Sequence, residues 1–163
     1  MYARPEAQPL LEPLIVSWGW ESETPGDSPF IDHHEWTGTR NIAAFLSVPA
    51  AIEFMRTHDW DQVRAECHAL AREFRNRLTE QTGLPPLSPD SPEWYAQMVA
   101  IPLPACDVVV LKKRLYDEHR IEVPVFMWNG MPLIRASFQI YNTEQDVGYA
   151  VSALSALGIR CRR

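Results

Sequence analysis

Two short stretches of the sequence carry side chains that could bind an anion. In the first, Gly38, Thr39 and Arg40 stand directly before a segment expected to be helical. Free backbone N–H groups at a helix start, a hydroxyl and a cationic side chain together suit a phosphate or a carboxylate. The structural alternative is that Thr39 caps the helix and Gly38 supplies a tight turn. The three residues alone favour that alternative.

The second stretch is an alternating strand pattern centred on Arg135. One face of the pattern is apolar and is expected to be the core: Ile134, Ala136, Phe138 and Ile140. The opposite face holds Leu133, Arg135, Ser137 and Gln139. Arg135 could therefore present its planar guanidinium to a carboxylate. An internal ion pair with one of the 21 acidic residues is the alternative, and the pattern alone favours the ion pair.

Cysteine chemistry and metal binding have weaker support. Cys67, Cys106 and Cys161 include no pair at metal-binding spacing, and Cys67 falls on an apolar helical stripe. Cys106 precedes a helix start, where its pKa could be lowered, although a structural thiol is the preferred interpretation. The run from Asp32 to Glu35 offers four metal ligands, but residues 30–41 are expected to be extended. Neighbouring side chains would then point to opposite sides, so we predict no metal site.

Composition excludes several classes of partner. A chain of 163 residues with 46% hydrophobic and 22% charged residues suits one folded domain with extended arms. The net charge is −6, and the only basic run is Arg160, Arg162 and Arg163, so no nucleic-acid partner is predicted. No apolar stretch reaches the roughly 18 residues of a membrane span, and residues 1–6 do not resemble a signal peptide. The expected compartment is the cytoplasm.

The elements that position these residues are predicted from periodicity. Residues 13–17 are expected to form a strand, and residues 1–41 a strand with an extended arm. Residues 41–57 are apolar on all sides and predict a well-buried helix, with a kink or break at Pro49. Residues 59–82 form the clearest amphipathic helix, with Asp59 and Gln62 as a capping box and Gly83 as its end.

The second half of the chain predicts a small sheet with helices. We expect strands at residues 96–103, 121–128 and 132–140, with a helix that starts at Asp107 between the first two. Pro124 suggests an edge strand, and the Asn129-Gly130 pair predicts a hairpin. A last helix follows a capping box of Thr143 and Asp146. The predicted fold class is α+β, a small antiparallel sheet with helices on one face, in a domain of residues 42–163 that includes linking helices 42–82.

Several motifs of the chain resemble one enzyme family. They are PLIVSWGW (13–20), EWTGTRN (35–41), VPAAI (48–52), RIEVPV (120–125), IRAS (134–137) and YNT (141–143). In this order they resemble the C-terminal part of class V aminotransferases, which are fold-type I pyridoxal-phosphate enzymes. Within that family, the isopenicillin N epimerase-like branch is the most similar. The resemblance extends from about residue 2 to residue 157.

The resemblance implies a set of roles. The family forms homodimers with active sites at the subunit interface, and its substrates are amino acids. Gly38 and Thr39 match the turn that reaches the partner subunit and binds the cofactor phosphate. Arg135 matches the arginine that holds the substrate's α-carboxylate, in the small domain of residues 96–157 that closes over the site. Asn41 stands where the family commonly has aspartate.

The family's Schiff-base lysine has no counterpart in the chain. Lys112 and Lys113 are the only lysines, and they lie side by side on the polar face of a predicted helix. The resemblance places the catalytic lysine and the large domain before residue 1, so we predict no catalytic residue here. The expectation is therefore a C-terminal segment that binds no pyridoxal phosphate covalently and is inactive alone.

Two other functions stay open beside this one. The first is a stand-alone dimerisation or interaction module, whose apolar surface around Trp18, Trp20 and Trp36 would meet a second copy or a partner. The second is a cysteine desulfurase-like activity with Cys106 as the nucleophile, although the residues around Cys106 do not resemble that motif. Epimerisation, transamination and lyase chemistry are not distinguished by the sequence.

Overall fold

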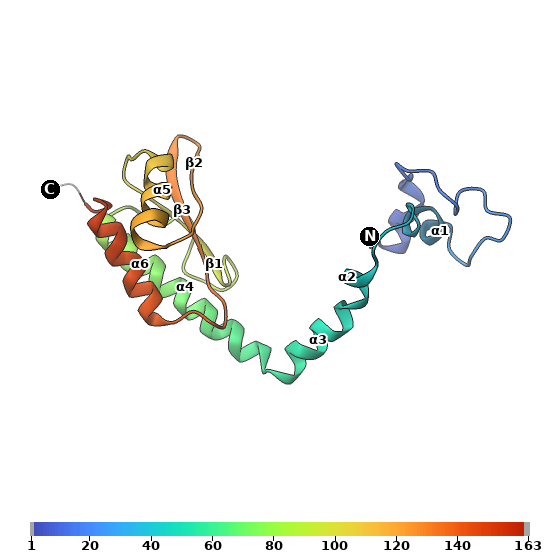
Figure 1. The fold of residues 1–163 in the computed structure, drawn as a ribbon, viewed down its shortest axis with the longest axis horizontal. Helices are drawn as coiled ribbons and strands as arrows, with labels where there is room; N and C mark the ends of the chain where they lie inside the picture. Colours follow the sequence, from blue (N-terminus) through green and yellow to red (C-terminus); the bar gives the residue numbers. More distant parts are fainter. Residues whose placement is uncertain (1, 162–163) are drawn as a thin grey trace. The chain divides into compact units, whose positions relative to one another are not determined.

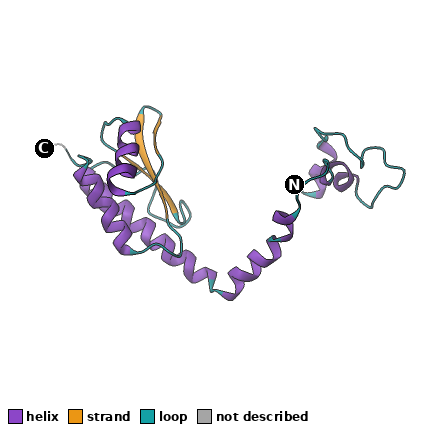
Figure 2. Cartoon of the chain, in the orientation of Figure 1, coloured by secondary structure: helices purple, strands orange, loops and turns teal. Residues whose placement is uncertain are grey.

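The structure is a computed structural model that describes residues 2–161, and it has the predicted α+β fold (Figures 1 and 2). The chain divides into two compact units, Met1–Glu53 and Phe54–Arg163. The first contains short helices and irregular segments. The second contains the three long helices and the sheet, and it is the unit with a hydrophobic core.

The sheet of the second unit has three antiparallel strands in the order β1-β3-β2. They are β1 (Met98–Pro102), β2 (Val125–Trp128) and β3 (Met131–Ser137). Asn129 and Gly130 join β2 to β3 with φ values of 47° and 75°, which confirms the predicted hairpin. The edge position of β2 is as predicted, but the strand starts at Val125 rather than at residue 121, so Pro124 directly precedes it and does not lie within it. The central strand β3 therefore carries Arg135 between two hydrogen-bonded neighbours.

Helices α4 (Trp60–Thr82), α5 (Val108–His119) and α6 (Glu144–Ala156) share one core with the sheet (Figure 1). The strands contribute alternate residues to this core, namely Val99, Ile101, Val125, Ile134 and Ala136. The helices contribute their apolar stripes, including Phe74, Leu78, Leu111, Leu115, Val147 and Leu154. Ile140 was expected inward but is exposed, because β3 ends at Ser137 and the chain then turns.

The N-terminal caps of the helices in the second unit agree with prediction in two cases of three. Asp107 accepts hydrogen bonds from the N–H groups of Val109 and Val110, both at 3.0 Å. The capping box of Thr143 and Asp146 is present at the start of α6. The capping box predicted at Asp59 is wrong, because that residue is left-handed at φ 45° and its side chain makes no cap bond. Gly83 ends α4 in the left-handed conformation, as predicted.

The first unit departs further from the predictions. The strand expected at residues 13–17 is wrong: this segment is irregular, since the one sheet among residues 2–161 lies in the second unit and offers it no partner. The extended segment expected at residues 30–41 is also wrong, because α1 occupies Pro29–Glu35. Ser28 accepts from the N–H of Ile31 and Pro29 takes the first helical position, a typical helix start. A 3₁₀ helix, η1, spans Pro5–Leu10.

The helix predicted at residues 41–57 is broken, as Pro49 indicated, into α2 (Ala43–Leu46) and α3 (Val48–Thr57). Its predicted burial is wrong. Phe45 and Leu46 are 60% and 69% exposed, and none of residues 2–53 is buried. The first unit is too small to cover these side chains, so its apolar surface stays open. None of the helices among residues 2–161 combines the length and the apolar character that a membrane crossing requires.

Candidate functional site

Arg135 occupies the middle of β3, directly opposite Ala100 of β1. Its own N–H donates to the carbonyl oxygen of Pro124 at 3.0 Å, so the backbone is held from both sides. Its neighbours Ile134 and Ala136 are buried in the core, and alternation therefore directs the arginine side chain away from it. Arg135 is exposed, as the sequence predicted.

The guanidinium of Arg135 makes no hydrogen bond or ion pair with any of residues 2–161. Other arginines of the same unit are paired: Arg72 contacts Asp90 at 2.7 Å, and Arg114 donates twice to Glu118. The ion pair that the sequence pattern favoured for Arg135 is therefore not formed within this part of the chain. Its five donors are available to an external anion.

The face of the sheet around Arg135 is mostly apolar. Residues that pair across the strands share a face, so Met98 lies beside Ser137, and Trp128 beside Met131, on the same side as Arg135. Met98 and Trp128 are both about half exposed. We call the face formed by Met98, Ala100, Trp128, Met131, Arg135 and Ser137 the outer face. It offers one cation within an apolar surface, which suits a ligand or a protein surface that brings a carboxylate.

The turn at Gly38 and Thr39 lies in the first unit and is open. Gly38 has φ 120°, and a Cβ built there meets no atom within 4 Å. The Thr39 hydroxyl has no partner among the residues that the structure describes, and Asn41 Oδ1, rather than Thr39, accepts from the N–H of Ala43 at 2.9 Å. The interpretation of Thr39 as a helix cap is thus wrong. The Thr39 hydroxyl and the backbone at Gly38 are therefore available to bind a ligand.

The Arg40 guanidinium makes its hydrogen bonds within the segment around this turn. It donates to the Glu35 carbonyl oxygen at 2.6 Å and to Thr37 Oγ1 at 3.2 Å. It also lies over the ring of Phe45, 5.0 Å from the centroid. These contacts brace the turn on either side of Gly38, and they place one positive charge beside it.

The residues present fit non-covalent binding of a phosphate better than covalent attachment of a cofactor. Lys112 and Lys113 are exposed on α5, and Lys113 pairs with Asp117. Neither side chain is enclosed, so neither is held in a closed site beside which an aldehyde would be bound. When bound, pyridoxal phosphate supplies an electron sink. The described residues offer it a turn for its phosphate and no suitable lysine.

The surroundings of the Cys106 thiol do not favour nucleophilic chemistry. Burial raises the pKa of this thiol, and the neighbouring Asp107 carboxylate raises it further. The alternative of a lowered pKa at this helix start is therefore wrong, since the capping carboxylate opposes the thiolate, and the preferred interpretation was a structural thiol. Cys67 is buried in the core, as predicted, and burial raises its pKa as well. No group of three His, Cys, Asp or Glu side chains within residues 2–161 is placed to hold a metal ion.

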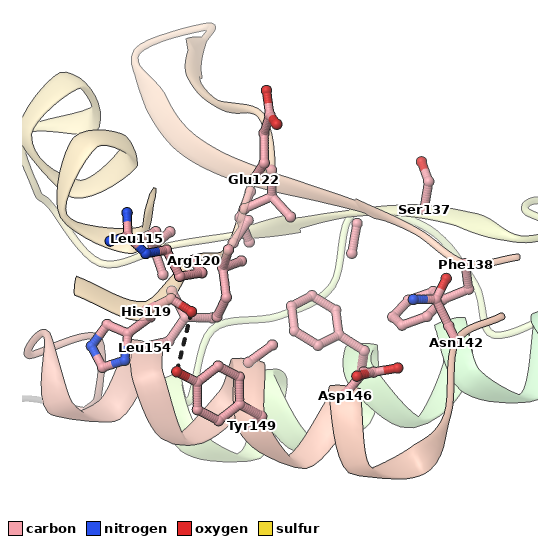
Figure 3. Close-up of a pocket in the computed structure, with 16 residues that line it drawn as sticks. Leu115, His119, Arg120, Glu122, Ser137, Phe138, Asn142, Asp146, Tyr149 and Leu154 are labelled. Carbon is pink, nitrogen blue, oxygen red and sulfur yellow. Dashed lines mark hydrogen bonds between the residues drawn. The ribbon is translucent and has the colours of Figure 1, made fainter. Parts of the chain in front are cut away.

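Figure 3 shows a cavity of about 430 Å³ that is lined partly by Ile134 and Ala136, the buried neighbours of Arg135 on β3. Its floor is apolar and includes Phe74, Phe138 and Leu154. One polar group on its wall, the Tyr149 hydroxyl, donates to the His119 carbonyl oxygen at 3.1 Å (dashed in Figure 3). It was not predicted, because its lining comes from separated segments, and it contains none of the predicted site residues.

The family of the chain follows from comparison with known proteins. The sequence model of the Aminotransferase class-V family matches residues 31–149, which include both the Gly38 turn and Arg135. The chain therefore belongs to this family, which is in general pyridoxal-phosphate-dependent.

Particular relatives are more informative than the family. The chain is 35% identical over 158 residues to the isopenicillin N epimerase of Amycolatopsis lactamdurans, covering 91% of this chain and 40% of that protein. Identity to the Streptomyces clavuligerus epimerase is 34%, over 90% of this chain and 40% of the relative. A probable chloroplastic L-cysteine desulfhydrase of Arabidopsis thaliana is 30% identical over 77% of this chain and 30% of its own length. The chain spans about two fifths of the length of the epimerases.

Proposed function

We propose that this chain is the C-terminal region of a pyridoxal-phosphate-dependent class V enzyme that acts on an amino acid, and that Arg135 binds the α-carboxylate of the substrate. One observation carries the proposal: Arg135 is fixed on the central strand, yet its guanidinium has no partner among residues 2–161. An unpaired arginine within an apolar face gives strong, two-point recognition of a carboxylate.

The Gly38–Thr39 turn would bind the cofactor phosphate, in a homodimer in which the turn belongs to the partner subunit. Its open backbone and unpaired hydroxyl support this role, and Arg40 adds a positive charge. The exposed apolar surface of residues 2–53 supports association, because apolar patches of that extent are normally covered. The covering surface is a second subunit or the large domain of the enzyme.

The catalytic lysine would come from outside this sequence. Lys112 and Lys113 are exposed on a helix whose apolar side faces the core, and Lys113 pairs with Asp117. We therefore propose that the 163 residues alone are not catalytically competent. Their own contribution is to bind and orient, through Arg135 and the Gly38 turn.

Among the reactions open to the family, epimerisation is our first choice, because similarity to the two epimerases is greater than to the desulfhydrase. Lyase chemistry and transamination are the alternatives. A cysteine desulfurase-like mechanism is disfavoured, since burial and Asp107 raise the pKa of Cys106.

A stand-alone interaction module is the second candidate function. The observation that favours it is the absence of any buried residue among residues 2–53, while Trp18 is 87% exposed. Sedimentation of the pure chain tests it: a stable dimer supports the module, and a soluble monomer at high concentration argues against it.

The proposed function is tested in the assembled, lysine-containing enzyme by Arg135→Ala, with Arg64→Ala on α4 as a control that also removes one exposed charge. Loss of a two-point charge-assisted contact lowers kcat/KM for the amino acid by about 100-fold. For the matching amino-acid amide, which lacks the carboxylate, the variant and the parent enzyme converge. An equal loss with both substrates, or no loss beyond the control, would refute the role of Arg135.

A further inference from the structure

The first unit contains two adjoining cavities of about 400 and 340 Å³. Both are lined by Leu11, Glu12, Pro13, His33 and His34, so the segment after η1 and the last turns of α1 form their common wall. The larger cavity also includes Trp20 and Phe30. Neither cavity includes Arg135 or Gly38, and neither is used by the function proposed above.

His34 has one ring nitrogen without a partner. Its Nδ1 lies 2.9 Å from the carbonyl oxygen of Phe30, and since a carbonyl only accepts, Nδ1 must carry the proton and donate. In the neutral ring Nε2 is then an acceptor. This atom is buried and has no hydrogen-bond partner within residues 2–161. Buried polar atoms are normally satisfied, so Nε2 requires a donor that the described chain does not supply.

Glu12 is an exposed carboxylate without a partner in the described chain. It lines both cavities and makes no ion pair or hydrogen bond with the rest of the described chain. No lysine or arginine lines either cavity. The cavities therefore contain the Glu12 carboxylate and the unpaired acceptor His34 Nε2, and no cationic side chain of the described residues lines either cavity.

The charge of the whole unit points the same way. Residues 1–53 contain eight acidic residues but only Arg4 and Arg40, a net charge of −6. Residues 54–163 contain 13 acidic and 13 basic residues, so the excess negative charge of the protein lies entirely in the first unit. Arg40 is already committed to Glu35 and Thr37. Away from the Gly38 turn, where Arg40 supplies a positive charge, the excess acidic residues of this unit favour cations.

Aromatic rings complete the larger cavity. Trp20 packs on His33 with ring centroids 4.8 Å apart, and Phe30 packs on His34 at 4.6 Å. Aromatic faces attract ammonium and guanidinium groups. A metal ion is a poorer match, because no group of three ligating side chains within residues 2–161 is suitably placed.

We propose that these cavities form a binding site for an organic cation with N–H donors, a primary ammonium or a guanidinium. Glu12 neutralises its charge, His34 Nε2 accepts one of its hydrogen bonds, and Trp20 provides an aromatic wall. The chemistry is the same for a free amine and for a lysine or arginine side chain of another protein. The cavities include none of Arg135, Gly38 and Thr39, although Thr37, which directly precedes the Gly38 turn, lines the smaller one.

The probe is n-butylammonium chloride, added to the full chain while the ring-nitrogen shifts of its five histidines are followed by NMR. Tetramethylammonium, a cation without donors, and sodium butyrate, an anion, are added at the same ionic strength. The site predicts a saturable shift at His34 Nε2 with butylammonium, a weaker response to tetramethylammonium and none to butyrate. The signal is assigned as the one that His34→Gln removes.

Glu12→Gln is the test variant, and Glu23→Gln is the control, since it removes the same charge from the same unit outside both cavities. Loss of the carboxylate weakens butylammonium binding by about tenfold, whereas the control leaves it within about twofold. Equal binding by the two variants, a response to butyrate, or no saturable shift at His34 would overturn the site. Because Glu12 is exposed and unpaired, its variant is expected to fold, and circular dichroism checks this.

A short peptide with one internal lysine separates the two sources of the cation. Binding of this peptide at least about tenfold tighter than butylammonium indicates a protein partner. Binding of the free amine with exclusion of the peptide indicates a small-molecule ligand. Either result supports the site, and failure of butylammonium to bind contradicts it whatever the peptide does.

Discussion

Arg135 and Ala100 face each other across the β1–β3 ladder. A methyl group is too short to cover or pair with a guanidinium, so the arginine is positioned by its backbone and left free at its tip. The next residues on either side, Ile134 and Ala136, are buried and fix the register of the strand. The fold therefore holds Arg135 in place without using its charge.

If Arg135 has no structural role, Arg135→Ala should change the free energy of unfolding by less than about 0.5 kcal/mol. Arg75 is the matched contrast, because it is only 7% exposed, donates to the Ser88 carbonyl at 2.9 Å and lies over Tyr95. Arg75→Ala should cost about 2 kcal/mol, through lost packing and an unpaired carbonyl. Urea unfolding measures both, and similar losses would show that Arg135 has a partner.

Stability should fall at both ends of the pH scale through Asp90 and Tyr95. The hydrogen bond from Tyr95, and then the bond from Arg72, lower the pKa of the Asp90 carboxyl. Its contribution is therefore present at neutral pH and is lost as the pH falls below the ordinary aspartate value of about 4. Burial, and then the bond to Asp90, raise the pKa of Tyr95 to about 12.

The Tyr95 contribution is complete below the ordinary tyrosine pKa of about 10 and is lost as the pH rises toward the folded value. Tyr95→Phe should abolish this alkaline loss of stability. It should reduce the acid loss without abolishing it, because Arg72 still pairs with Asp90. Thermal unfolding from acid to alkaline pH tests this. A variant with an unchanged profile would show that the Asp90–Tyr95 bond does not control it.

The start of α6 offers a local test of capping. Thr143 and Asp146 satisfy each other's backbone N–H groups, and Thr143→Ala removes one half of that exchange. We expect a loss of about 1 kcal/mol. Ser152→Ala is the control on the same helix, since its hydroxyl bonds only to the Gly148 carbonyl one turn earlier. It should be close to neutral, and a larger loss for Ser152→Ala would contradict the assignment.

Two glycines should respond to alanine with opposite signs. Gly130 has φ 75° in the hairpin with nothing within 4 Å of a new Cβ, so only the backbone opposes substitution. Gly130→Ala should destabilise the chain by about 1 kcal/mol. Gly148 lies inside α6, and its nearest contact is the flexible tip of Arg77 at 3.3 Å. Gly148→Ala should stabilise by about 0.5 kcal/mol. Chemical denaturation of both variants decides whether this contrast holds.

The second unit could be predicted from sequence because its elements bury each other. The apolar stripe of residues 59–82, the Asn129-Gly130 turn and the Thr143–Asp146 box each specify a local structure that the core then confirms. In the first unit this agreement between local pattern and burial fails. A strand at residues 13–17 needs a neighbouring strand, and an apolar helix at residues 41–57 needs a surface that covers it. The first unit supplies neither, since residues 2–53 contain no sheet and none of them is buried.

One missed element had a signal. Ser28 followed by Pro29 is a typical helix start and predicts α1, whereas the polar run that follows is typical of an extended loop. For the site, alternation along β3 was enough to place Arg135 on the exposed face. Alternation could not show that its guanidinium stays unpaired, because ion pairs depend on which acids the fold brings near. The two cavities with Glu12 and His34 were not foreseen, since three separate segments line them.

The measurement that tests the account most directly is reduction with borohydride after the pure 163-residue chain has been incubated with pyridoxal phosphate, followed by peptide mass spectrometry. We expect no stoichiometric pyridoxyl adduct, because Lys112 and Lys113 are exposed on α5 and, in the function proposed above, neither is the catalytic lysine. A single stoichiometric adduct at either lysine would contradict it, and would mean that the chain holds the cofactor covalently on its own.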